Sequence, residues 1–181
     1  MEWANRVAGT IKRNFRFIDQ FILNNLYKAL VRPLIEYGQS VWSPWLIRQS
    51  KSIENVQRRV TRMIPGFKDL SYNERLLLLK LPSLKYRRLR GDLIEVYNIL
   101  NRKESDNVKT ICRLSEVKHT RGHNKKLALS HSNTNRKKYS FSNRIVTHWN
   151  NLPANVVNAT NTNCFKNLLD KSLSHLMYDF D

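Results

Sequence analysis

The residues of this chain whose types and spacing could do chemistry are basic side chains grouped along helix-like segments. Residues three or four apart share one face of a helix, so neighbours within a group can act together. This arrangement suits contacts with the phosphates of a nucleic-acid backbone, and nearby aromatic rings could stack on bases. The ten predicted nucleic-acid-binding residues are Lys12, Arg13, Arg16, Arg58, Arg59, Arg62, Lys85, Arg87, Arg88 and Arg90. The alternative for each is a solvated surface cation.

The charge balance of the whole chain agrees with this prediction. Thirty-two Lys and Arg face 14 Asp and Glu, for a net charge of +18. Residues 1–100 hold 18 of the basic and 8 of the acidic residues, and residues 101–148 hold 12 and 3. Charge of one sign destabilises a compact state unless an anionic partner relieves it. Nucleic acid is the partner expected for such a balance, with an anionic membrane surface as the second choice.

Catalytic motifs are scarce. A metal-dependent polymerase or nuclease needs carboxylates that converge on Mg²⁺, and no adjacent pair of Asp residues occurs in the chain. The nearest nuclease-like pattern is Asp106 with Glu116 and Lys118, for which a solvated loop is the preferred interpretation. No nucleophile elbow and no glycine-rich phosphate loop is present. We therefore expect no catalysis by this chain alone.

A zinc site is also not predicted. Cys112, His119, His123 and His131 could in principle supply ligands. Their spacing matches no common structural zinc site, and a second nearby Cys is missing. Surface histidines among basic residues are the better interpretation, and we expect no cofactor. With two cysteines and no signal-peptide pattern, the chain is expected to be intracellular.

The elements that must position the basic groups are helices. Asp19 is placed to cap a helix whose apolar stripe would be Ile22, Leu23, Leu26, Leu30 and Leu34. Pro33 should kink or divide that helix, and the Trp42–Trp45 segment with its proline should end it. A second helix over 52–64 would bury Ile53, Val56, Val60 and Ile64.

Two further signals complete the first hundred residues. Ser71 and Glu74 fit a capping box at the start of a short helix. A longer helix over about 84–100 would bury Leu89, Leu93, Val96, Tyr97 and Leu100. Residues 1–100 are thus predicted to form a helical bundle.

Residues 101–181 are expected to be different in character. In the basic loop of residues 101–140, Lys126–Ser130 and Lys138–Phe141 could pair as short strands. Helices should return over 141–177, with Trp149 on one buried face and Phe165 on another. The predicted fold class is therefore mainly α: a helical bundle, then a basic loop with short strands, then a small helical extension.

Several segments together resemble a known family. They are "LVRPLIEYG", "VQRR" with the "MIPG" that follows it, "RRLRGDLI" and "FSNRIVTHWNNLPANVV". In this order they are similar to the region that follows the catalytic palm in reverse transcriptases of LINE-type (non-LTR) retrotransposons, close to the jockey-like group. The resemblance spans nearly all 181 residues.

The resemblance implies a role in nucleic-acid binding within an RNA-directed DNA polymerase. Residues 1–100 would include the thumb, a helical element that holds the RNA/DNA template–primer duplex. Residues 101–181 would be the C-terminal extension. Mg²⁺ and its Tyr-x-Asp-Asp hairpin would belong to the palm, which with the fingers would be a partner missing from this chain. Met1 stands where the family continues from the palm, so we expect an internal start in a truncated copy.

The resemblance also implies a location, in ribonucleoprotein particles of the nucleus and cytoplasm. No zinc site carries over, because nothing matches the zinc knuckle of some related elements. One alternative is a degenerate transposon remnant without a selected function, whose apolar surface around Trp3, Val7 and Ile11 would lack its palm partner. The other is the Mg²⁺-dependent nuclease built on Asp106, Glu116 and Lys118.

Overall fold

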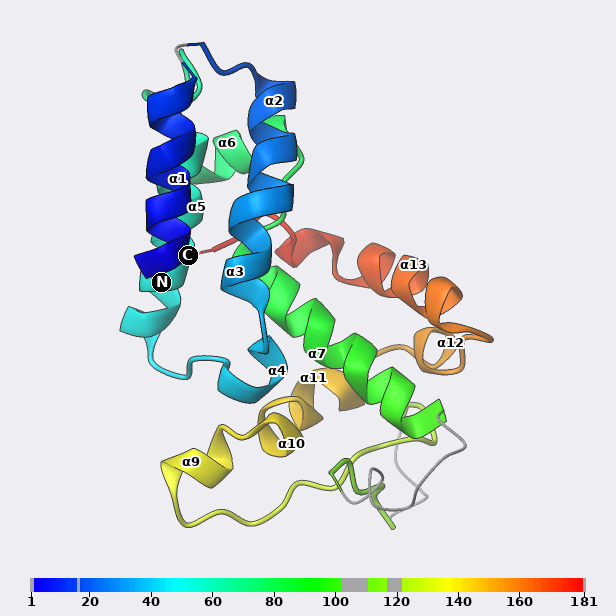
Figure 1. Ribbon diagram of the computed structural model, residues 1–181. Helices are drawn as coiled ribbons and strands as arrows, with labels where there is room; N and C mark the ends of the chain where they lie inside the picture. The colour runs from blue at the N-terminus through cyan, green and yellow to red at the C-terminus, as the bar shows by residue number, and fades with distance from the viewer. Residues whose placement is uncertain (1, 16, 102–110, 117–121, 181) are drawn as a thin grey trace. The chain divides into compact units, whose positions relative to one another are not determined.

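The computed structural model describes residues 2–15, 17–101, 111–116 and 122–180 (Figure 1). Within these ranges the chain is mainly helical and contains no β-strand, only an isolated antiparallel bridge between Leu114 and Leu127. The prediction of a mainly α protein is confirmed. Across the same ranges, no helix has the length and apolar character needed to cross a membrane.

The chain divides into two compact units. Unit 1 consists of Met1–Arg88 together with Leu176–Asp181, and unit 2 consists of Leu89–His175. The boundary falls within helix α7 (Leu84–Asn101). Each unit has its own buried apolar cluster.

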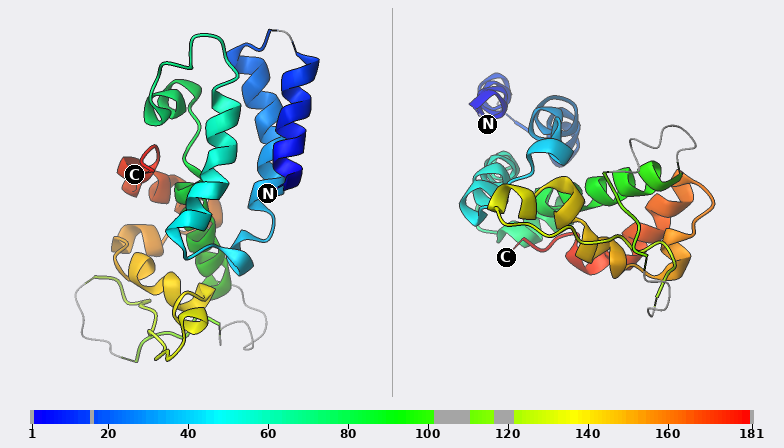
Figure 2. Two further views of the ribbon diagram at one scale, coloured as in Figure 1. Left: turned by 90° about the vertical axis from the view of Figure 1, so that its left-hand side faces the viewer. Right: turned by 90° about the horizontal axis from the view of Figure 1, so that it is seen from below.

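Unit 1 is built from helices that surround a single core. Its elements before α7 are α1 (Glu2–Asn14), α2 (Gln20–Leu26), the π-helix η1 (Tyr27–Val31), α3 (Arg32–Glu36), α4 (Gln39–Trp42), α5 (Ile47–Thr61) and α6 (Tyr72–Leu79). Helix α1 packs beside η1, α3 and α5 (Figure 2). The helix that follows Asp19 ends at Glu36, before the predicted Trp42–Trp45 break. Trp42 is the last residue of α4, and residues 43–46 separate α4 from α5.

The helix that begins after Asp19 is interrupted, as its proline predicts. The Asp19 carboxylate accepts a hydrogen bond from the backbone N–H of Ile22 at 2.7 Å, which confirms the cap. Pro33 has no N–H to donate, and the π-helix η1 ends two residues before it. The predicted helix is therefore divided into three segments, α2, η1 and α3.

The buried stripe of this interrupted helix differs from the prediction. The core residues are Leu23, Tyr27, Val31 and Ile35. Leu30 and Leu34, expected inside, are each 48% exposed. A π-helix has more residues per turn than an α-helix. Residues four apart therefore stay close to one face of the helix through η1, and the buried residues are spaced by four.

The helix predicted over 52–64 lies earlier, at Ile47–Thr61, but its predicted buried residues and the capping box are confirmed. Ile53, Val56, Val60 and Ile64 are all buried. Ser71 and Glu74 form the capping box: the Ser71 Oγ accepts from the Glu74 N–H at 3.3 Å, and a Glu74 carboxylate oxygen accepts from the Ser71 N–H at 2.7 Å.

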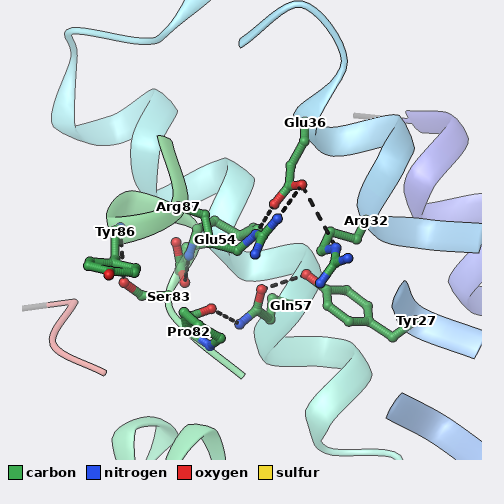
Figure 3. A network of polar contacts seen from close by, with 10 residues as sticks. Tyr27, Arg32, Glu36, Glu54, Gln57, Pro82, Ser83, Tyr86 and Arg87 are labelled. Carbon is green, nitrogen blue, oxygen red and sulfur yellow. Dashed lines mark hydrogen bonds and ion pairs between the residues drawn. The ribbon is translucent and has the colours of Figure 1, made fainter. Parts of the chain in front are cut away.

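A buried polar network links the helices of unit 1 (Figure 3). The Tyr27 hydroxyl donates to Gln57 Oε1 at 2.5 Å, and Gln57 Nε2 donates to the Pro82 carbonyl at 3.1 Å. Glu54 is fully buried and accepts from the Tyr72 hydroxyl at 2.5 Å and from the Leu84 N–H at 3.0 Å. Burial raises the pKa of Glu54, while these hydrogen bonds act in the opposite direction.

Unit 2 is built around Trp149. Its elements after α7 are α9 (Asn135–Lys138), α10 (Phe141–Arg144), α11 (Val146–Asn150), α12 (Ala154–Val157) and α13 (Thr162–Ser172), and the 3-10 helix η2 (Ser174–Leu176) follows. Trp149 and Phe165 are fully buried, and the Tyr97 ring stacks on Phe165 with centroids 4.3 Å apart. Both aromatic residues predicted for buried faces are therefore in the core.

The predicted pairing of short strands is wrong. Lys138 lies in α9 and Phe141 begins α10, while Lys126–Ser130 is extended without forming a strand. On one side its backbone pairs with residues 113–115: the Ser115 N–H donates to the Lys126 carbonyl at 2.7 Å, and the Ala128 N–H donates to the Arg113 carbonyl at 2.8 Å. On the other side, two amide side chains take the place of a neighbouring strand. Asn150 accepts from the Leu127 N–H at 2.8 Å and donates to the Leu127 carbonyl at 3.0 Å, and Asn143 does the same for Ser130 at 3.2 Å each.

Candidate nucleic-acid interface

A hollow of about 820 Å³ lies in unit 1, with walls from α1, from the end of α5 and from the segment after α5. Its lining residues are Asn5, Ala8, Gly9, Lys12, Arg59, Arg62, Met63 and Lys68. We call it the basic hollow, because four of these eight residues are cations and none is acidic. It is the place in unit 1 where predicted binding residues from two separate groups come together.

Helix α1 supplies one wall because its lining residues share a face. Asn5, Ala8, Gly9 and Lys12 follow spacings of three and four. Gly9 has no side chain, so nothing projects from this position into the hollow, whereas Ala8 is 4% exposed and belongs to the core. Lys12 is exposed at the end of this face.

Helix α5 and the segment that follows it supply the other cations. Arg59 Nη1 donates to Asn5 Oδ1 at 2.9 Å, which holds the guanidinium in place between the two walls. Arg62 is the C-cap of α5 and is exposed. Lys68 was missed by the sequence prediction. Its signal was weak: a lone cation two residues after the Pro65–Gly66 turn.

Arg13 and Arg58, the remaining described residues of the first two groups, lie in different places. A Cβ placed on Gly9 would lie 3.8 Å from Arg13 Nη1, so the Arg13 guanidinium is next to the α1 wall. Arg58 is directed elsewhere: its guanidinium carbon lies 4.6 Å from the Tyr72 ring centroid and 5.2 Å from that of Phe180. The predicted residue Arg16 lies outside the described residues.

The third group is engaged within the protein. Arg87 forms an ion pair with Glu36 through two hydrogen bonds, one of them 2.9 Å long (Figure 3). Arg88 is 7% exposed and donates to the Ser50 hydroxyl at 2.8 Å.

The other two members of this group, Arg90 and Lys85, differ from each other in their contacts. Arg90 binds both oxygens of Asp170, at 2.5 and 2.8 Å. Lys85 is exposed. A phosphate contact by Arg87, Arg88 or Arg90 would have to compete with these intramolecular partners. Their role in binding stays a prediction, and we do not place the interface on them.

Electrostatic repulsion acts beside the basic hollow. Arg75 is buried and donates to the Phe67 carbonyl at 3.5 Å. Burial lowers the pKa of the Arg75 guanidinium, and the nearby positive charge of Arg62 lowers it further.

The described residues provide no arrangement that supports the nuclease hypothesis. Asp106 and Lys118 lie outside the described residues, and Glu116 is exposed and paired with Arg113 at 2.8 Å. Acidic pairs with one residue between them also occur, at Glu104–Asp106 and Asp179–Asp181. Each pair has at least one member outside the described ranges.

The residues considered for zinc are also placed by the structure, except His119, which lies outside the described ranges. Cys112 is buried, and burial raises the pKa of its thiol to about 11, so the metal-binding thiolate is disfavoured at neutral pH. His123 is buried at 3% exposure, so the prediction of a surface histidine is wrong for this residue, and one of its ring nitrogens is 3.1 Å from the Trp149 carbonyl oxygen. His131 is exposed. Among described residues, no group of three or more His, Cys, Asp or Glu could hold a metal ion.

The apolar surface expected around Trp3 is smaller than predicted. Trp3 is 71% exposed and Val7 is half-buried. Ile11 is only 4% exposed, because the same face of α1 packs on the core of unit 1.

No protein-family model, curated protein or solved structure matches this chain.

Proposed function

We propose that this chain binds nucleic acid without sequence preference, as the thumb and C-terminal region of a LINE-type reverse transcriptase. The observation that carries the proposal is the basic hollow, in which Lys12, Arg59, Arg62 and Lys68 line one cavity. Its ligand would be the backbone of an RNA/DNA template–primer duplex.

The geometry of the hollow suits phosphate recognition. Its cations project from two packed helices and the segment that follows, so the fold brings their backbone positions together before a ligand binds. Arg59 is already oriented by Asn5, and its planar guanidinium can donate two hydrogen bonds to one phosphate. No acidic residue is among the lining residues, so no carboxylate of the lining competes with a phosphate for these cations.

The proposal assigns no catalysis to this chain. The palm and fingers of the parent polymerase are the proposed protein partners and would supply the carboxylates that bind Mg²⁺. Support comes from the sequence, which combines a net charge of +18 with no adjacent Asp pair. The role in this proposal is to hold the duplex.

The test is duplex binding measured by fluorescence anisotropy over a series of salt concentrations. The wild-type protein should show log K falling linearly with log[salt]. The quadruple variant Lys12→Gln, Arg59→Gln, Arg62→Gln, Lys68→Gln should reduce that slope by about 0.9 for each phosphate that the mutated side chains no longer neutralise, up to ~3.6.

The control is a second quadruple variant with the same loss of charge away from the hollow. It carries Lys28→Gln, Arg48→Gln, Lys51→Gln and Lys171→Gln, all at exposed positions. The control should retain most of the wild-type slope. Equal slopes for the two variants would contradict the proposal, because binding would then reflect net charge alone.

A further inference from the structure

Unit 2 contains a second group of cations, on α9. Between Glu116 and Asp170 the sequence has no acidic residue at all. Helix α9 lies within this stretch, next to α10 (Figure 1). Three consecutive residues of the helix, Arg136, Lys137 and Lys138, are exposed.

The charge of these three residues is not neutralised within the described part of the chain. No carboxylate there forms an ion pair with Arg136, Lys137 or Lys138. Arg144, which belongs to the same acid-free stretch, is by contrast paired with Asp92 at 2.9 Å, and its side chain is 16% exposed. The two kinds of basic residue therefore have different roles: Arg144 is structural, and the α9 cations face solvent.

Helix α9 is anchored at both ends. The Thr134 hydroxyl oxygen accepts from the Lys137 N–H at 3.3 Å and caps the first turn. The Lys137 carbonyl accepts from Asn143 Nδ2 at 2.9 Å and from the Ser140 hydroxyl at 2.8 Å. Asn143 is 5% exposed, so the anchor is part of the folded unit. The cations are thus displayed on an ordered turn.

The arrangement of the three cations indicates the size of the ligand. Consecutive residues on an α-helix point about 100° apart, so these side chains diverge around the turn. Diverging cations cannot converge on one small anion, whereas an extended polyanion that crosses the turn can contact several of them.

We propose that Arg136, Lys137 and Lys138 form a second nucleic-acid-binding surface, which contacts backbone phosphates independently of sequence. The identification of the ligand as nucleic acid rests on the proposed function, but the surface itself is separate from the basic hollow. It assigns a binding role to the extension after the helical bundle.

The experiment compares the triple variant Arg136→Gln, Lys137→Gln, Lys138→Gln with wild type, using labelled duplex and labelled single strand over a salt series. If each of the three cations neutralises one phosphate, the variant should reduce the slope of log K against log[salt] by about 2.7 on duplex or ~2.1 on a single strand. The control Lys28→Gln, Arg48→Gln, Lys171→Gln removes one Arg and two Lys elsewhere and should change the slope by less than about 0.9. An α9 variant with the slope of this control on both ligands would overturn the inference.

The quadruple variant of the basic hollow (the hollow variant) distinguishes a failure of this inference from a failure of the proposed function. If the hollow variant keeps the wild-type slope while the slope of the α9 variant on duplex falls by about 1.8 or more, the proposed hollow fails and the α9 surface stands. If only the hollow variant has a reduced slope, the α9 surface fails and the proposed function stands.

An anionic membrane is the competing polyanion. Co-sedimentation with vesicles of phosphatidylcholine and phosphatidylserine, at the salt concentration where nucleic acid binds, should leave wild type in the supernatant. Vesicle binding that the α9 variant loses, with its nucleic-acid binding intact, would overturn the assignment.

Discussion

At the scale of single residues, Asn143 and Asn150 decide the conformation of the basic loop. Each amide group both donates to the carbonyl and accepts from the N–H of one loop residue, Ser130 for Asn143 and Leu127 for Asn150, and Asn143 also donates to the Lys137 carbonyl. This is the hydrogen-bonding pattern that a neighbouring strand would otherwise provide. The sequence lacks a helical period here and is interpreted as short strands, because a local pattern does not show which group satisfies the backbone.

We predict that Asn150→Ala destabilises unit 2. Leu127 is buried, so its N–H and carbonyl would lose their partner without access to bulk water, at a cost of about 1–3 kcal/mol. Urea denaturation followed by circular dichroism measures the free energy of unfolding. Asn155→Ala, at an exposed position on α12, is the control and should lie within ~0.5 kcal/mol of wild type. Equal stabilities of the two variants would show that water replaces the amide.

At the scale of elements, α7 uses its charged side chains to hold other helices. Within unit 2, Arg90 pairs with Asp170 of α13, and Asp92 pairs with Arg144 of α10. Within unit 1, Arg87 pairs with Glu36 of α3. The basic cluster at the start of α7 therefore has a structural role, whatever further contacts it makes with a ligand.

The burial of each ion pair should determine how much its loss lowers the free energy of unfolding. The Asp92 side chain is 6% exposed, so Arg144→Ala leaves a buried carboxylate without its partner and should cost about 3 kcal/mol or more. Arg90→Ala should cost ~1 kcal/mol or less, because Asp170 is 34% exposed and can be solvated. The exposed pair of Arg113 with Glu116 is the control, and Arg113→Ala should be near neutral. Denaturant unfolding measures all three, and a larger loss for Arg90→Ala than for Arg144→Ala would contradict this order.

At the scale of the whole molecule, the net charge of +18 should oppose the compact state. Raising the ionic strength from about 0.01 M to 0.15 M shortens the screening length from ~30 Å to ~8 Å. We therefore predict that Tm rises over this range, by ~2–4 °C for each kcal/mol of repulsion that is screened.

Differential scanning calorimetry at several NaCl concentrations measures this rise. A short nucleic-acid duplex added at low salt should raise Tm further, because a ligand that binds only the folded state stabilises it. A Tm that falls with salt would mean that attractive ion pairs outweigh the repulsion.

The sequence by itself determined the local properties of this protein. The mainly helical character, the Asp19 cap and the capping box at Ser71 follow from interactions within a few residues, so they could be predicted. The buried stripe of α5 followed from helical periodicity in the same way. Net charge is a sum over the chain and needs no structure.

Only the tertiary structure decided which cations are available to a ligand. Glu36 is 51 residues from Arg87, and Asp170 is 80 residues from Arg90, so no local pattern could show that these arginines are paired. The approach of α1 to α5 brought Lys12 and Arg59 to one hollow, and it added Lys68, which lay outside every predicted group. The physical reason is that helix formation depends on neighbours in sequence, whereas the pairing of charges depends on neighbours in space.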